Sequence, residues 1–165
     1  MSGRRSADMP KELAVRHAEE GDVAAVTQLV NAAFEVERFF LGADRLNATE
    51  VRARMGRGTF LLLEDSGTVV GCIYAELRGE NGYIGLLSVE PTRQGSGLSR
   101  ILMNAAEEHF RERGCRLAEL RVVNLRTVLP GYYRHLGYRE ARTEPFPADI
   151  PALLQCHFIV MTKAL

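Results

Sequence analysis

One segment, Val89-Glu-Pro-Thr-Arg-Gln94-Gly95-Ser96-Gly97-Leu98-Ser99-Arg100, joins the end of an apolar strand to the start of an amphipathic helix through a glycine-containing loop. The strand runs from Tyr83 to Val89 and ends at Pro91, which cannot continue a ladder of hydrogen bonds. After the loop the apolar residues recur at helical spacing, and Gly114 ends the helix. This strand, loop and helix predict a ligand site at the helix N-terminus.

The ligand expected there is an anion. The first turn of a helix leaves about four backbone N–H groups without intrahelical partners, and the helix dipole adds about half a positive charge. Gly95 and Gly97 lack the Cβ atoms that would keep a pyrophosphate from those donors. The alternative is that the two glycines only form a tight turn. Arg100 replaces the third glycine of a dinucleotide-binding G-x-G-x-x-G, and no Gly-Lys-Ser/Thr follows, so neither the Rossmann nor the Walker A pattern fits.

The rest of the chain alternates between strand and helix patterns. We expect a first strand over Leu13–His17, a helix that Asp22 caps, and a shorter helix from Thr49 through Arg57. Further strands are expected over 60–63, 69–75, 83–89, 117–123, 138–142 and 155–162, with helices over 98–110 and 128–136. Three adjacent antiparallel strands followed by a β-α-β crossover predict an α+β fold with a mixed sheet.

Composition limits the classes of function. The chain has 165 residues, enough for one domain. Lys and Arg number 21, as do Asp and Glu, so no net charge favours nucleic acid or an anionic membrane as a partner. No apolar run is long enough to span a bilayer, and no secretory signal is recognisable. We expect residues 1–11 to be a disordered tail, residues 12–165 to form the domain, and the protein to be cytoplasmic, which suits its three scattered cysteines.

Two motifs resemble those of the GNAT family, the GCN5-related N-acetyltransferases. The family's phosphate-binding signature is Gln or Arg, two residues, Gly, one residue, then Gly or Ala; the segment from Gln94 matches it except that Ser99 takes the last place. Downstream, Tyr133-Arg-His-Leu-Gly137-Tyr138 resembles the family's pattern of Tyr, three residues, Gly and an aromatic residue. The order of predicted elements is also similar to that of the family from about residue 12 to the end.

The resemblance implies a single GNAT domain, with a mixed, mostly antiparallel, splayed sheet flanked by helices. It implies acetyl-CoA as cosubstrate and N-acetyl transfer to a primary amine, which we expect to belong to a small molecule. Tyr133 would be the general acid for the departing sulfur, since a phenol and a thiol have ordinary pKa values of about 10 and 8.5; the other reading is a packed aromatic side chain. The resemblance places the cofactor against Leu87, Val89, Gln94, Gly95, Ser96, Gly97, Leu98, Ser99, Arg100 and Asn124.

Several questions stay open at this level. Glu35, Glu37, Glu76 and Glu119 are candidate general bases, and a water chain is an equal alternative. No residues have metal-ligand spacing, so no metal is expected. Protein N-terminal or lysine acetylation is a rival function, because the motifs concern the cofactor and not the acceptor. A non-catalytic acyl-CoA sensor is a second rival, and a homodimer is left open. Basic residues on the second helix could face an anionic acceptor or solvent: Arg52, Arg54 and Arg57.

Overall fold

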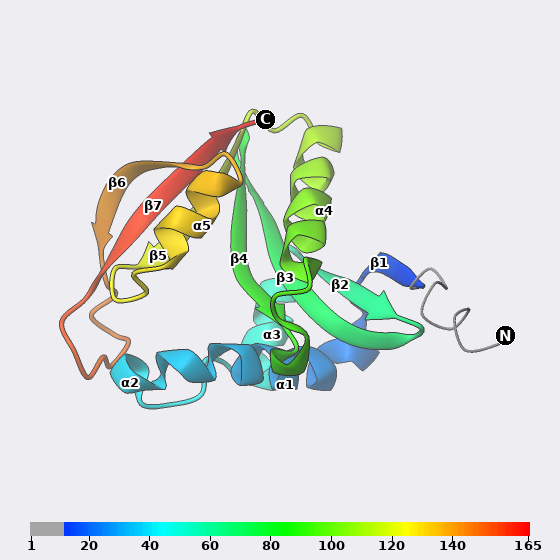
Figure 1. The fold of residues 1–165 in the computed structure, drawn as a ribbon, viewed down its shortest axis with the longest axis horizontal. Coiled ribbons are helices and arrows are strands. Elements are labelled where there is room, and N and C mark those ends of the chain that lie inside the picture. The colour runs from blue at the N-terminus through cyan, green and yellow to red at the C-terminus, as the bar shows by residue number, and fades with distance from the viewer. Residues whose placement is uncertain (1–11) are drawn as a thin grey trace, which may run out of the picture.

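A computed structural model describes residues 12–165, and these form one seven-stranded mixed sheet (Figure 1). The predicted disordered tail, residues 1–11, lies outside the described residues. The strand order is β1-β2-β3-β4-β5-β7-β6, and only the β4–β5 pair is parallel. The strands are β1 Leu13–His17, β2 Thr59–Asp65, β3 Thr68–Arg78, β4 Asn81–Val89, β5 Leu117–Val123, β6 Arg139–Pro145 and β7 His157–Ala164.

Helices cover both faces of the sheet, and each face has its own apolar core. On one face lie α1 (Val23–Ala33) and α3 (Ala48–Met55); on the other lie α4 (Leu98–Glu112) and α5 (Leu129–His135). Strand β2 is apolar on both sides because Phe60 and Leu62 pack towards α1 while Leu61 and Leu63 pack towards α4. A strand buried on both faces loses the alternation of apolar and polar residues that marks a half-exposed strand.

The predicted order of strands and helices is confirmed apart from one short additional helix, and two predicted helix caps are wrong. Helix α3 is capped by Asn47, whose Oδ1 accepts a hydrogen bond from the Glu50 N–H at 2.9 Å, and not by Thr49. Asp22 precedes α1, but its carboxylate makes no capping bond to that helix. The additional helix follows α1, where a 3₁₀ turn, η2 (Phe34–Glu37), continues into a short helix, α2 (Arg38–Leu41).

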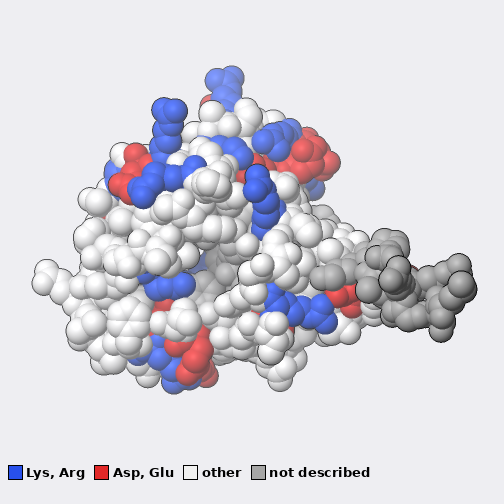
Figure 2. Space-filling model, in the orientation of Figure 1, with Lys and Arg blue, Asp and Glu red and all other residues white. Residues whose placement is uncertain are grey.

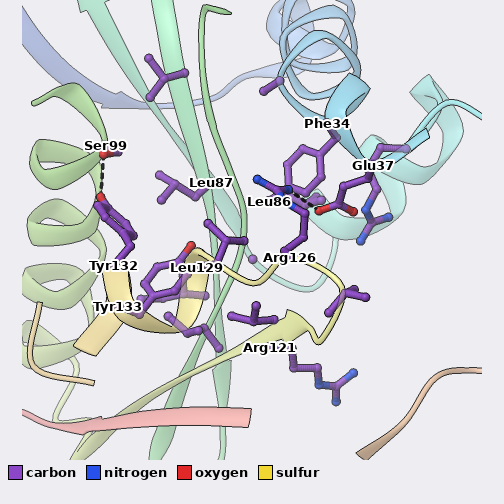
Figure 3. A pocket seen from close by; sticks show the side chains of 18 of the residues that line it. Phe34, Glu37, Leu86, Leu87, Ser99, Arg121, Arg126, Leu129, Tyr132 and Tyr133 are labelled. Carbon is purple, nitrogen blue, oxygen red and sulfur yellow. Dashed lines mark hydrogen bonds and ion pairs between the residues drawn. The ribbon is translucent and has the colours of Figure 1, made fainter. Parts of the chain in front are cut away.

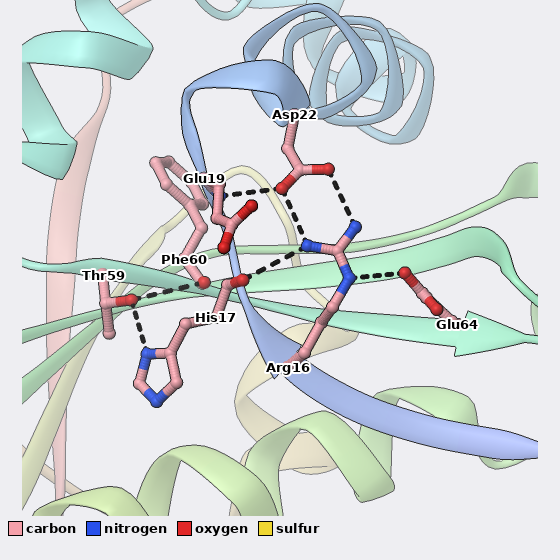
Figure 4. Close-up of polar contacts among 7 residues, drawn as sticks. All are labelled: Arg16, His17, Glu19, Asp22, Thr59, Phe60 and Glu64. Atoms are coloured by element: carbon pink, nitrogen blue, oxygen red, sulfur yellow. Dashed lines mark hydrogen bonds and ion pairs between the residues drawn. The ribbon is translucent and has the colours of Figure 1, made fainter.

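Arg16 explains why Asp22 does not cap α1. The guanidinium of Arg16 donates two hydrogen bonds of 2.8 Å to the two carboxylate oxygens of Asp22 and a third to Glu64 on β2 (Figure 4). Asp22 also accepts from the Glu19 N–H at 2.7 Å. These bonds hold the pKa of Asp22 at about 2, well below its usual range. The network joins β1, β2 and the start of α1 at one edge of the sheet.

Strand β4 changes direction at Leu86, and this bend opens the sheet. Leu86 has a φ of 53°, a conformation uncommon for residues other than glycine, and its carbonyl accepts a hydrogen bond from Ser88 Oγ at 2.9 Å. The β3–β4 register shifts at the same place. Only residues Asn81–Ile84 of β4 pair with β5, and their partners are Leu117–Leu120. Beyond Ile84 the two strands separate, so their facing backbone groups are free for another partner.

No helix within residues 12–165 is long and apolar enough to cross a membrane.

Gly82 should be required for the close packing of α4 against the closed end of the β4–β5 pair. A Cβ placed there would lie 2.3 Å from Phe110 of α4, which is fully buried. We expect Gly82→Ala to lower the free energy of unfolding by about 1–3 kcal/mol, the usual cost of overpacking a core. Urea denaturation measures it.

The matched control is Gly21→Ala. A Cβ at Gly21 meets no atom within 4 Å, and its φ is not positive. This variant should unfold within about 0.5 kcal/mol of the parent chain. Equal stability of the Gly82→Ala and Gly21→Ala proteins would contradict the packing argument.

Candidate active site

A cavity of about 920 Å³ occupies the space where β4 and β5 separate. Its walls come from β4 and β5, the loop before α4, the helix α5, the α1–α3 region and the β6–β7 segment. Figure 2 shows the molecule hollowed at this place, with basic side chains beside the hollow. The cavity therefore connects the predicted phosphate-binding turn at one end with the helices expected near an acceptor at the other.

The N-terminus of α4 has the geometry that an anion requires. Gly97 is the N-cap residue, has a φ of 83°, and no side chain bonds to the first turn. Gly95 has a φ of 82°. A Cβ at either glycine would meet no atom within 4 Å and would instead occupy the space over the loop that a ligand needs. The N–H groups of the first helical turn thus stay available, and they fit the pyrophosphate of a CoA thioester.

Most of the predicted cofactor residues line this cavity. They are Leu87, Val89, Gln94, Gly95, Gly97, Leu98, Ser99 and Arg100. Ser96 is exposed, is not part of the lining, and its hydroxyl donates to the Arg93 carbonyl. Asn124 is not part of the lining either. Its Oδ1 accepts a hydrogen bond from the His157 N–H at 2.8 Å, and this bond fastens the end of β5 to the start of β7.

Ser99 makes a contact that the sequence did not reveal. Its Oγ lies 2.6 Å from the hydroxyl of Tyr132, so α4 and α5 are joined across the cavity wall (Figure 3). The motif predicted a small residue at position 99, but the hydroxyl of serine also holds Tyr132. The sequence shows two adjacent tyrosines in α5. Their spacing alone does not tell which of them contacts α4.

Tyr133 points into the cavity from α5, on the side of β4 opposite to Glu37 (Figure 3). The side chain is 9% exposed and has edge-to-face contacts with Tyr132 and Tyr138. Burial raises the pKa of the Tyr133 hydroxyl well above its ordinary value, and the neighbouring hydroxyl of Tyr132 raises it further. The phenol is therefore protonated at neutral pH and can act as a hydrogen-bond donor or as an acid.

Glu37 is the one candidate base among the four that lines the cavity. It is 6% exposed, and its Oε2 accepts a hydrogen bond from Arg126 Nη1 at 2.8 Å (Figure 3). Burial raises the pKa of Glu37 above its usual range, and attraction by Arg126 and Arg45 offsets only part of that rise. A buried carboxylate with a raised pKa beside a cavity is a stronger proton acceptor than an exposed one.

The other three candidates lie elsewhere. Glu35 is exposed and pairs with Arg38 at 2.8 Å. Glu76 accepts a 2.7 Å hydrogen bond from the Tyr74 hydroxyl and also pairs with Arg78, and Glu119 pairs with Arg142 at 2.9 Å. None of these carboxylates lines the cavity. Glu35 and Glu37 both belong to the 3₁₀ turn η2, in which the two side chains point to different environments.

The acceptor end of the cavity is bridged by the segment between β6 and β7. The Leu153 N–H donates a 2.6 Å hydrogen bond to the Phe40 carbonyl at the end of α2. The Leu153 side chain packs against Gly42, so closely that a Cβ there would lie 2.9 Å from Leu153 Cδ1. Phe146, Pro147 and Ile150 of the same segment line the cavity. This end of the cavity is therefore a chamber that the segment between β6 and β7 bridges.

Solved structures with the same fold include proteins named as acetyltransferases. The ribosomal-protein-S18-alanine N-acetyltransferase of Escherichia coli matches 92% of this chain and 93% of its own, with 17% identity and a TM-score of 0.75. Ard1 of Thermoplasma volcanium matches 93% and 97%, with 16% identity and a TM-score of 0.77. Nourseothricin acetyltransferase matches 92% and 98%, with 17% identity and a TM-score of 0.72. At these identities the likeness concerns the fold alone.

The fold and the cavity together belong to a class of enzymes that transfer acyl groups from CoA thioesters to amines. The sequence profile of the acetyltransferase (GNAT) family matches residues 23–138, which is well over half of the chain. The chain therefore belongs to the GNAT family and is an acetyl-CoA-dependent N-acyltransferase.

Gly97→Val should abolish the approach of a phosphate to the α4 N-terminus. We expect the affinity for CoA to fall at least ten-fold, measured by calorimetry, because the added side chain fills the space over the first-turn N–H groups.

Gly67→Val is the control for backbone strain. Gly67 has a φ of 84°, almost the same as Gly97, but it lies in the β2–β3 turn, and a Cβ there also meets no atom within 4 Å. Both variants should lose similar stability, and only Gly97→Val should lose CoA binding. A folded Gly97→Val protein with undiminished affinity would refute the assignment of the phosphate site.

Proposed function

We propose that this enzyme transfers an acetyl group from acetyl-CoA to the primary amine of a small molecule, with Tyr133 as general acid and Glu37 as general base. The observation that carries the proposal is one cavity that begins at the α4 N-terminus, passes between β4 and β5, and ends in a bridged chamber. Tyr133 and Glu37 line it from opposite sides of β4 (Figure 3). An acid and a base on either side of one reaction centre are what acyl transfer to an amine needs.

The α4 turn and β4 would hold the cosubstrate. The backbone of residues 94–100 would bind the pyrophosphate, and the free edges of Leu87 and Val89 would pair with the pantetheine arm as a neighbouring strand does. The thioester supplies an electrophilic carbonyl and a thiolate leaving group. Asn124 has no part in this proposal, because its side-chain oxygen already accepts the His157 N–H outside the cavity.

The two titratable residues have separate tasks. The Glu37 carboxylate would take the proton that the ammonium group of the acceptor must lose before its nitrogen can attack the thioester. The Tyr133 hydroxyl, which is protonated at neutral pH, would donate a proton to the departing sulfur. The water chain considered from the sequence is unnecessary where a buried carboxylate already lines the cavity.

A small acceptor is favoured over a peptide by the segment between β6 and β7, which contributes Phe146, Pro147 and Ile150 to the chamber wall. The bond between the Leu153 N–H and the Phe40 carbonyl fastens this segment to α2, so the segment would narrow the space open to an extended peptide. The names of related structures include both kinds of acceptor, since the Escherichia coli enzyme is named for a ribosomal protein and another for nourseothricin. The non-catalytic sensor is disfavoured by Tyr133 and Glu37, because a binding module needs neither an acid nor a base at the thioester.

Tyr133→Phe should keep the affinity for acetyl-CoA within a few-fold and lower turnover about ten-fold or more, because only the acid is removed. Release of the CoA thiol with an accepted amine measures turnover. Tyr132→Phe is the matched control, since Tyr132 lies beside Tyr133 but its hydroxyl bonds to Ser99. Turnover equal to that of the parent chain in the Tyr133→Phe protein would remove Tyr133 from the mechanism.

Glu37 should determine the acid limb of the pH profile of kcat/KM. A base must be deprotonated, so activity should rise with pH through the pKa of Glu37, which burial raises. Arg126→Met removes a charge that lowers this pKa, so the acid limb should move to higher pH, whereas Arg126→Lys should leave it nearly in place. Glu37→Gln should lower turnover about ten-fold or more and abolish the limb. A limb that stays unchanged in both the Glu37→Gln and Arg126→Met proteins would exclude Glu37 as the base.

A further inference from the structure

Two arginines of the acceptor chamber are without an ionic partner among residues 12–165. Arg45 and Arg54 both line the cavity, and neither side chain forms an ion pair or a hydrogen bond with another described residue. The two other arginines of the α3 region differ. Arg52 pairs with Glu20 at 2.7 Å and Arg57 with Glu76 at 3.5 Å, and both are exposed outside the cavity.

Each unpaired guanidinium is nevertheless held in place. The guanidinium carbon of Arg45 lies 5.7 Å from the centre of the Phe34 ring, and that of Arg54 lies 5.3 Å from the centre of the Tyr74 ring. Tyr74 is itself fully buried, and its hydroxyl lies 3.0 Å from the carbonyl oxygen of Arg54. Cation–π contacts of this kind orient a guanidinium while leaving its N–H donors free for a ligand.

The carboxylates near the two arginines do not satisfy them. Glu37 is engaged by Arg126, and Asp44 bonds to Arg38. Glu50 lines the same chamber but is exposed, and it lies beyond ion-pair distance of Arg45 and Arg54. Burial and the neighbouring charge of Arg54 lower the pKa of Arg45, and attraction by Glu37 and Glu50 offsets only part of this.

A ligand with a negative group would supply the ion-pair partner that Arg45 and Arg54 lack among the described residues. A planar guanidinium presents paired N–H donors that match the two oxygens of a carboxylate. The rest of the chamber is partly apolar, with Phe34, Leu41 and Phe146 in its wall. Glu37 lines the cavity together with the two arginines, so an amine and an anionic group of one small molecule have different partners available.

We propose that the acceptor is a small amino acid, whose carboxylate is bound by Arg45 and Arg54 while its amine faces Glu37. This inference rests on the proposed N-acetyl transfer and specifies its substrate class. Arg45 and Arg54 are binding residues in this scheme. Their effect should therefore appear in KM for acceptors that carry a carboxylate. Because Arg45 also lowers the pKa of Glu37, the variants are compared at a pH above the acid limb of the profile.

The test measures acetylation of matched acceptor pairs, a panel of α- and ω-amino acids each compared with its own carboxamide. The two members of a pair share the side chain and differ in the negative charge and, for α-amino acids, in the pKa of the amine, so kcat/KM is calculated for the deprotonated amine. The parent chain should prefer the amino acid at least ten-fold in kcat/KM. Arg45→Gln should bring this ratio close to one by raising KM for the amino acid, while kcat/KM for the carboxamide changes less than about three-fold. Arg54→Gln should also lower the ratio of kcat/KM for the amino acid to kcat/KM for the carboxamide.

Arg52→Gln is the matched control, because Arg52 lies on the same helix, faces away from the cavity and is paired with Glu20. It should leave both rates unchanged. Thermal denaturation of each variant establishes that it is folded. Equal kcat/KM for amino acids and carboxamides in the parent chain, or an equal loss for both members of a pair in Arg45→Gln, would overturn the assignment of an anionic acceptor while leaving acetyl transfer intact. Absence of transfer to every amine, by protein that binds acetyl-CoA, would overturn the proposed function as well.

Discussion

The separation of β4 from β5 is the constraint on which the rest of the molecule depends. Parallel pairing stops at Ile84 and Leu120, and the positive φ of Leu86 turns β4 away. A buried residue in this conformation costs free energy, and it persists because β3 and Ser88 hold the bend from the other side. The opening exposes a strand edge inside the protein, where unpaired backbone groups need a partner. An extended acyl-CoA arm would meet that need, as a neighbouring strand would.

The two ends of the cavity have different electrostatic character because different elements build them. At one end, helix α4 begins at Gly97 with no side-chain cap, so backbone N–H groups and the helix dipole dominate. At the other end, the charges belong to side chains of η2, α3 and the segment between α2 and α3, where Arg126 holds Glu37 but nothing within residues 12–165 pairs with Arg45. The first arrangement suits the phosphates common to all CoA thioesters, and the second can distinguish one acceptor from another.

Local sequence rules predicted elements well and boundaries less well. Asn47 and Thr49 are both good caps, and only the backbone conformation at Asn47, with φ −122° and ψ 174°, decides between them. Asp22 was expected to cap α1, but a bidentate contact with Arg16, on a strand six residues earlier, competes for the same carboxylate. At Asp22 a tertiary contact therefore overrides a local preference.

The sequence by itself determined the family, the order of the strands and helices, and the glycine-containing turn at residues 94–100 that is proposed to bind phosphate, because these depend on periodicity and on residues adjacent in the chain. It also singled out Tyr133, through a spacing within one short segment. Only the tertiary structure separated Glu37 from Glu35, Glu76 and Glu119, since exposure and ion pairing depend on elements far apart in sequence. For the same reason it alone distinguished Arg54 from Arg52 and Arg57, and brought Arg45 to its side. A side chain's identity is local, whereas its solvent exposure and its ionic partners are properties of the whole fold.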